Sequence, residues 1–139
     1  MKVVSFKYGQ TVIKQGDKEN RMYVILEGEV EIRLRSGENE IVVTHLRKND
    51  FFGEMSLFRN RPRSADVIAR TDVKLAYIES LQQLQKFLVN NPAFAFKMVL
   101  ILAERLGRTD ELLIGKVSEA NRLKLTSFVD KDEDLFEDL

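Results

Sequence analysis

The sequence predicts a mainly β fold: an antiparallel β-barrel or jelly roll (a double-stranded β-helix) followed by a short helix and a long C-terminal helix. Residues 1–79 contain many short apolar or alternating runs with turn signals between them, a pattern typical of such barrels. In residues 80–125 the apolar residues recur at helical spacing instead. The 139 residues therefore suit one domain over residues 1–125, with residues 126–139 as an appended tail.

The first part of the barrel region is interpreted as four strands with turns between them. Val30, Ile32 and Leu34 alternate with charged residues, which is the period of a half-buried strand. Gly16 and Gly37 each lie in a polar cluster that indicates a turn. The four strands are expected at residues 11–14, 22–26, 30–34 and 41–44.

Two more strands and a short helix follow along the chain. The strands are expected in the apolar runs at residues 65–69 and 73–78. Ser80 is a residue type that caps helix N-termini, so we expect a helix from there to Leu88. Pro92 suits the first turn of the next helix.

The long C-terminal helix is expected at residues 93–125, where the chain has no proline. An apolar stripe runs along it at spacings of three, four or seven residues: Val99, Leu102, Leu106, Leu113, Val117 and Ala120. A helix of about nine turns is too long to be covered by one small barrel. We therefore expect it to pair with a second copy in a homodimer, the alternative being a helix that folds back on its own barrel.

Composition and motifs exclude several classes of function. The chain has no cysteine and a single histidine, His45, so neither a disulfide nor a metal site is expected. No nucleotide-triphosphate loop, nucleophile elbow or isolated acid–base carboxylate pair is present, so we do not expect an enzyme. The formal net charge of zero gives no support for nucleic-acid binding. The N-terminus lacks a signal peptide and no apolar run could span a bilayer, which predicts a cytoplasmic protein without membrane contact.

Residues 51–67 bring a glycine, a carboxylate and an arginine into one loop. Arg63 is permanently charged and can present two parallel donors to phosphate oxygens, which suits a buried anion that must be paired. Gly53 lets the backbone approach a ligand, and residues 54–57 would form one helical turn whose N–H groups face the anion. Glu54 repels an anion, so a ligand hydroxyl such as that of a ribose is its expected partner. The alternative is an ordinary exposed ion pair between Arg63 and Glu54.

The same segment resembles the phosphate-binding cassette of cyclic nucleotide-binding domains. Phe-Gly-Glu-Met-Ser-Leu at residues 52–57 and Arg-Ser-Ala at residues 63–65 match the family motif. The resemblance implies that Glu54 binds the ribose 2′-hydroxyl and that Arg63 binds the cyclic phosphate. The backbone groups that would complete the cradle are those of Gly53, Met55, Ser56, Ser64 and Ala65. Asn49 departs from the glycine usual in the family, but asparagine tolerates positive φ, so we expect the turn to persist.

The resemblance extends to the long helix, which is similar to that of the catabolite activator protein group. It implies that Arg105 pairs with Glu54 or the ligand and that Thr109 meets the purine. Arg105 and Thr109 are four residues apart and so share one helical face. Asp110 stands where serine is common, and its carboxylate could accept a hydrogen bond from an adenine amino group. The alternative is that Thr109 and Asp110 are polar interruptions in a helix seam. Candidate apolar walls for the sugar and base are Ile32, Val43 and Leu46.

The resemblance implies a regulatory protein that senses a cyclic nucleotide without a metal cofactor. Ser64, and not the threonine that often accompanies cGMP, follows the phosphate arginine, which favours cAMP. The ligand would neutralise Arg63 and draw the long helix over the base, which would change the dimer seam or the tail. Two alternatives stay open: the ligand-binding portion of a transcription regulator, and an adaptor whose barrel no longer binds nucleotide.

The C-terminal tail is strongly acidic. Residues 130–139 contain six acidic residues and one basic residue. The simplest interpretation is a solvated, frayed end of the chain. The alternative is an acidic peptide that binds a protein partner through Leu135, Phe136 and Leu139. In either case its charge argues against contact with nucleic acid.

Overall fold

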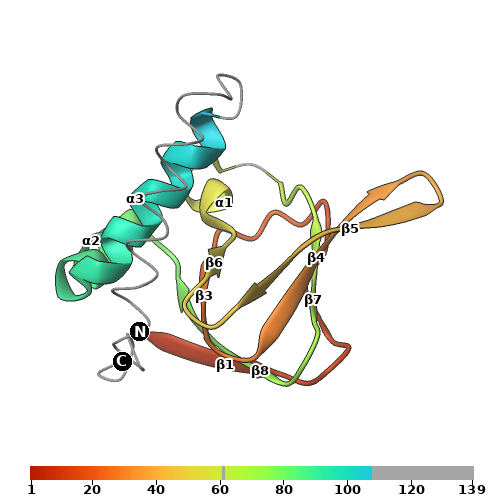
Figure 1. The fold of residues 1–139 in the computed structure, drawn as a ribbon, viewed down its shortest axis with the longest axis horizontal. Helices are drawn as coiled ribbons and strands as arrows, with labels where there is room; N and C mark the ends of the chain where they lie inside the picture. Colours follow the sequence, from red (N-terminus) through yellow and green to blue (C-terminus); the bar gives the residue numbers. More distant parts are fainter. Residues whose placement is uncertain (61, 108–139) are drawn as a thin grey trace. The chain divides into compact units, whose positions relative to one another are not determined.

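The computed structural model describes residues 1–60 and 62–107, and Figure 1 shows its fold. The first of its two compact units, residues 1–85, contains two four-stranded antiparallel sheets, ordered β1-β8-β3-β6 and β2-β7-β4-β5. The strands are β1 (Lys2–Phe6), β2 (Thr11–Ile13), β3 (Met22–Glu27), β4 (Glu29–Ser36), β5 (Asn39–Arg47), β6 (Phe51–Phe52), β7 (Asp66–Ala69) and β8 (Val73–Ile78). Together with the helices that follow, this confirms the predicted mainly β fold with C-terminal helices.

Successive strands alternate between the two sheets, except for β4 and β5, which form a hairpin within one sheet. The chain therefore crosses the barrel repeatedly, and loops at its ends bring distant segments together. The core is drawn from both sheets. Ile25 and Leu75 in one sheet and Val30 and Ala69 in the other are completely buried. Burying an aliphatic side chain of this kind stabilises the fold by about 1.5–3 kcal/mol.

The turn before β6 contains the asparagine that departs from the usual glycine. Asn49 has φ 75°, so it adopts the positive φ that was expected of this residue type. Its N–H donates to the Ile25 carbonyl at 2.9 Å, and the Ile25 N–H donates to the Asp50 carbonyl at 2.9 Å. These bonds tie the turn to β3 and hold the start of β6 in place.

The structure differs from the sequence-based expectation in three strands. β1 and β6 were not expected as separate strands, because β1 has no clean apolar alternation and β6 has only two residues. β5 is also longer than the predicted run at residues 41–44, since its pairing with β4 continues through charged residues at both ends. In both cases the neighbouring strand, and not the local sequence, determines the strand's extent.

Three helices are described: α1 (Glu54–Arg59), α2 (Leu81–Asn90) and α3 (Pro92–Leu106). The predicted cap of α2 is confirmed, since the Gln83 N–H donates to Ser80 Oγ at 3.1 Å. Pro92 occupies the first turn of α3, as predicted. The part of the predicted long helix that follows residue 107, with Leu113, Val117 and Ala120, lies outside the described residues.

The second compact unit begins at Lys86. Within it the rings of Phe87 and Phe94 pack edge to face with their centroids 5.1 Å apart. Two residues of the predicted apolar stripe are exposed on α3, Val99 at 61% and Leu106 at 84%. In the described ranges no single helix is long and apolar enough to cross a membrane; α2 and α3 reach the length and composition only together, and the chain bends by 119° between them.

Replacing Ile25 by alanine should destabilise the barrel by about 2–5 kcal/mol, because it leaves a cavity at a completely buried position. Ile41→Ala is the matched control, since Ile41 is 58% exposed in strand β5 and should lose less than about 1 kcal/mol. Urea unfolding followed by circular dichroism measures both free energies. Equal losses in the two variants would contradict the assigned core.

Candidate anion-binding site

The candidate site begins where β6 ends and α1 starts. Gly53 has φ 83° and ψ 6°, a left-handed conformation that turns the chain from strand into helix. α1 ends at Asn60, which has φ 52° and donates its N–H to the Ser56 carbonyl at 3.0 Å. The helical turn predicted at residues 54–57 is thus present, bounded by two left-handed residues.

Arg63 points into the protein, with only 6% of the residue exposed. Its Nη1 donates to the Gly53 carbonyl at 3.0 Å, and its Nη2 donates to the Arg21 carbonyl at 2.5 Å. The Arg63 backbone is also held, because its N–H donates to the Asp17 carbonyl at 2.7 Å and its carbonyl accepts from the Gly16 N–H at 2.8 Å. An exposed surface arginine is therefore ruled out.

One donor of this guanidinium has no partner within the described part of the chain. Arg63 Nε is buried and makes no hydrogen bond. Burial lowers the pKa of Arg63, while nearby groups oppose that shift: Glu19, Tyr23, Glu54 and Asp17. Arginine stays protonated at neutral pH all the same. A buried positive charge with an unused donor suits an anionic ligand, since buried polar groups are normally paired.

Gly53 allows the backbone to lie directly against the guanidinium. A Cβ on this residue would come within 2.5 Å of Arg63 Nη1 and 2.7 Å of the Arg21 carbonyl oxygen. No side chain fits in that space without moving the arginine or the strand. The cassette glycine is therefore required for the close approach as well as for its positive φ.

Glu54 and Ser56 are both buried residues of α1, with 3% and 4% of each residue exposed. Ser56 Oγ donates to the Glu19 carbonyl at 2.6 Å, which fixes α1 against the segment that precedes β3. Glu54 contributes to the electrostatic stabilisation of charged Arg63, so the two groups lie near each other. A buried carboxylate beside a buried guanidinium fits a ligand that carries both an anion and a hydroxyl.

The structure brings four predicted site residues together in the barrel: Gly53, Glu54, Ser56 and Arg63. Met55 and Ser64 are exposed and Ala65 is half-buried, so these three could contribute backbone groups at the rim. Arg105 lies in the last turn of α3, in the second unit, and is exposed. Thr109 and Asp110 lie outside the described residues. Of the predicted apolar walls, Ile32 and Leu46 pack against the core, whereas Val43 is 53% exposed.

The sequence analysis missed the segment before β3, which supplies the guanidinium's second carbonyl and its nearest ion pair in the described ranges. Glu19 Oε1 lies 4.0 Å from Arg63 Nη2 and 3.7 Å from Arg21 Nε. It also accepts a hydrogen bond from the Tyr23 hydroxyl at 2.5 Å. Burial, together with this bond and the Glu19 charge, raises the pKa of Tyr23 to about 12, so the hydroxyl remains a donor. No spacing signal links residues so far apart in the sequence.

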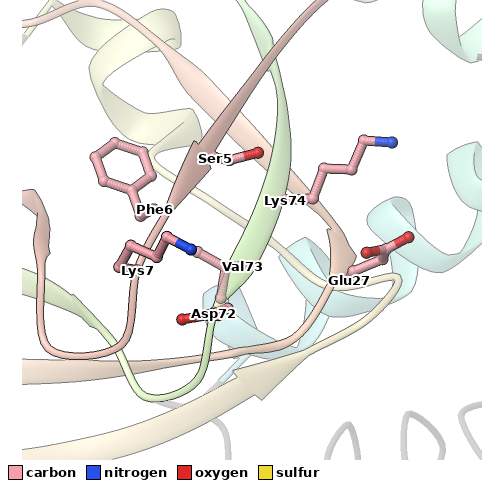
Figure 2. Close-up of a pocket in the computed structure, with 7 residues that line it drawn as sticks. All are labelled: Ser5, Phe6, Lys7, Glu27, Asp72, Val73 and Lys74. Atoms are coloured by element: carbon pink, nitrogen blue, oxygen red, sulfur yellow. The ribbon is translucent and has the colours of Figure 1, made fainter.

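A hollow of about 280 Å³ lies along β1 and β8, and its lining includes no predicted site residue. Figure 2 shows the seven residues that line it: Ser5, Phe6, Lys7, Glu27, Asp72, Val73 and Lys74. Asp72 is already used in the fold, because it accepts the Tyr8 N–H at 2.8 Å. Among the described residues, no group of three or more histidine or carboxylate side chains could hold a metal ion.

A family model described as the cyclic nucleotide-binding domain matches residues 3–91. The chain belongs to this family. The match includes both sheets and the whole cassette from Gly53 to Ala65. The resemblance stated on the cassette motif is therefore confirmed.

The similar proteins include a kinase regulatory subunit and transcriptional regulators. The cAMP-dependent protein kinase type II regulatory subunit of Drosophila melanogaster is 41% identical over 76 residues, which are 54% of this chain and 20% of that protein. The CRP-like cAMP-activated global transcriptional regulator of Mycobacterium tuberculosis is 31% identical over 111 residues, 79% of this chain and 49% of that protein. The solved N-terminal domain of a Streptomyces coelicolor transcriptional regulator is 32% identical with a TM-score of 0.59, covering 80% of this chain and 79% of that one. The chain thus spans a fifth of the length of the kinase regulatory subunit and about half of the length of the CRP-like regulator.

Replacing Gly53 by alanine should destabilise the protein more than replacing Gly9, although the two glycines have nearly the same φ of 83° and 84°. A Cβ at Gly9 meets nothing within 4 Å, so Gly9→Ala carries only the backbone strain of roughly 1–2 kcal/mol. Gly53→Ala adds the clash with Arg63 and Arg21, and we expect at least about 1 kcal/mol more. Urea unfolding measures the loss in free energy of unfolding for each variant. Equal losses would contradict the close approach of the Gly53 backbone to Arg63.

Proposed function

We propose that this chain is a regulatory sensor that binds a cyclic nucleotide in the cassette, with cAMP preferred over cGMP. The observation that carries the proposal is the buried Arg63 guanidinium, which is held by two carbonyls and whose Nε–H has no partner among the described residues. A cyclic phosphate is a single negative charge with acceptor oxygens. It would receive the spare donors of Arg63 and neutralise its charge.

The remaining cassette groups have complementary roles in this proposal. Glu54 would accept a hydrogen bond from the ribose 2′-hydroxyl, which explains a carboxylate near a phosphate site. Gly53 would let the backbone lie against the guanidinium without a side chain that displaces it. Backbone groups of Met55, Ser56, Ser64 and Ala65 would complete the cradle. Ser64, and not a threonine, following the arginine supports cAMP.

The base would be met by the second unit in this proposal. Arg105 would pair with Glu54 or the ligand, and Thr109 and Asp110 would contact the purine. Closure of this helix over the base is the regulatory step that we propose. A ligand shifts such an equilibrium only by its differential affinity for the two states, so contacts made only in the closed state would carry the signal.

The chain's place in a larger regulatory scheme is also a proposal. The Mycobacterium tuberculosis relative, matched over 111 residues, supports a role as the ligand-binding portion of a transcription regulator. The kinase regulatory subunit of Drosophila melanogaster supports a sensor that acts on a protein partner. In both of these proposed roles this domain is not catalytic. A cytoplasmic location and a protein partner for the acidic tail remain predictions.

Arg63→Ala should weaken cyclic nucleotide binding by about 1.5–3 kcal/mol, roughly 10- to 150-fold, because a charged hydrogen-bonding partner of the phosphate is lost. Arg59→Ala is the matched control, because Arg59 lies in the last turn of α1 but is exposed. The affinity of this variant for the cyclic nucleotide should change less than about threefold. Titration calorimetry with cAMP and cGMP measures the affinities, and circular dichroism verifies that each variant is folded.

A thermal-shift panel of cAMP, cGMP and cyclic dinucleotides on the unaltered protein completes this test. Stabilisation by cAMP above the others supports the proposed ligand. If none of these ligands raises the melting temperature, the adaptor alternative is supported instead. If the Arg63→Ala variant binds the cyclic nucleotide with unchanged affinity, the proposed contact between Arg63 and the phosphate is contradicted.

We further propose that the protein is a homodimer paired through α3. The supporting observation is the exposure of Val99 and Leu106, seven residues apart and so on one helical face. Val99→Glu should shift the protein from dimer to monomer in analytical ultracentrifugation, because it places a charge in the seam. Val89→Glu on α2 is the matched control, since Val89 is 73% exposed and outside the stripe. A monomeric unaltered protein would contradict this proposal.

A further inference from the structure

Glu19 lies beside the guanidinium that the proposed function assigns to the phosphate. Its Oε1 is 4.0 Å from Arg63 Nη2, a separation at which opposite charges attract strongly in a partly buried site. Of the Glu19 side chain 39% is exposed, whereas only 4% of the Arg63 side chain is. A partly exposed carboxylate thus lies beside the buried positive charge. An anion bound at Arg63 would lie within range of its charge.

Three other groups hold Glu19 in this position. The Tyr23 hydroxyl donates to Oε1 at 2.5 Å, and Arg21 Nε lies 3.7 Å from the same oxygen. The Glu19 backbone carbonyl accepts the Ser56 hydroxyl at 2.6 Å. Tyr23 is itself fixed, since it is 2% exposed and its ring stacks on Phe52 with centroids 5.2 Å apart. The carboxylate therefore has a defined position and is not a mobile surface charge.

We propose that Glu19 determines which ligand charge the cassette accepts: it favours singly charged phosphodiesters and disfavours doubly charged phosphomonoesters. This inference rests on the proposed function and names a selectivity residue outside the cassette motif. The Glu19 carboxylate offsets part of the attraction that Arg63 exerts on an anion, and it repels a second negative charge on the ligand in addition to the first. A phosphomonoester carries up to −2 near neutral pH, twice the charge of a cyclic phosphodiester.

The size of the effect follows from the doubled charge. A carboxylate roughly 6 Å from a ligand charge, screened as in water, weakens binding of a monoanion by about threefold. Coulomb repulsion is proportional to the ligand charge, so the same carboxylate weakens binding of a dianion by about ninefold. Removing the Glu19 charge should therefore improve the two affinities unequally. That inequality separates an electrostatic role from a purely structural one.

Glu79 provides a matched control for this electrostatic role. Its side chain is 37% exposed, and its Oε2 lies 3.7 Å from Arg21 Nε, the same separation that Glu19 has. Replacing either glutamate removes one negative charge and one Arg21 partner. Only Glu19 also forms an ion pair with Arg63 and accepts the Tyr23 hydroxyl among the contacts of the described residues. The difference between the two variants therefore reports on the contacts with Arg63 and Tyr23, and Glu19→Gln retains an acceptor for the Tyr23 hydroxyl.

The test is titration calorimetry of the full chain and its Glu19→Gln and Glu79→Gln variants with cAMP and with 5′-AMP, which share base and sugar. At pH 8 the 5′-AMP phosphate is a dianion. We expect Glu19→Gln to tighten cAMP binding about threefold and 5′-AMP binding about ninefold, and Glu79→Gln to change either by less than about twofold. Glutamine can still accept the Tyr23 hydroxyl, and the melting temperature verifies the fold. The gain should shrink in 1 M salt, where the Debye length is only about 3 Å.

The outcomes distinguish this inference from the proposed function. If the unaltered protein binds cAMP but Glu19→Gln leaves both affinities unchanged, the inference is overturned and the proposed function stands. The same holds if both ligands gain equally or if Glu79→Gln matches Glu19→Gln. If none of the three proteins binds either nucleotide at millimolar concentration, the proposed function fails and the inference with it. Binding by Glu19→Gln alone would support both.

Discussion

The burial of the Arg63 charge is the constraint on which the rest of the site depends. Removing a guanidinium from water costs several kcal/mol unless protein groups replace its hydration. Two carbonyl oxygens, from Gly53 and Arg21, provide that replacement at 3.0 and 2.5 Å. Carbonyl dipoles stabilise the charge without neutralising it. The barrel therefore holds a preorganised cation that still attracts an anion, which a fully paired arginine would not do.

Sheet pairing brings these two carbonyls to one place. Arg21 comes directly before β3, and Gly53 comes directly after β6, which pairs with β3 in the antiparallel sense. With Tyr23 opposite Phe52, the two flanking residues end at the same edge of the sheet. The side chain of Arg63 spans the gap from the chain that leads into β7. The carbonyl of Arg21, which lies 42 positions from Arg63 in the sequence, thus accepts a hydrogen bond from the guanidinium.

The sequence was sufficient where the determining contacts are local. The helical turn that starts α1, the cap of α2 and the positive φ of Asn49 all depend on residues within a few positions of one another, and these were predicted. β1, β6 and the full length of β5 depend on a partner strand, so their own residues gave too little signal. The Glu19 contact was missed for the same reason. Its partner is distant in sequence, and a single glutamate has no distinctive pattern.

In the proposed function the ligand meets groups from both units, and this has a consequence for signalling. Gly53, Ser56 and Arg63 form hydrogen bonds with one another or with the Arg21 and Glu19 carbonyls, and all of these residues belong to the first unit. Their geometry can provide affinity in every state of the protein, but equal affinity in two states shifts neither population. A regulatory response must therefore come from groups whose distance to the ligand differs between states. In the proposed function those groups belong to the second unit. Changes at Arg63 should therefore reduce the response mainly through the loss of ligand binding, whereas changes at Arg105 should also alter the response of the ligand-bound protein.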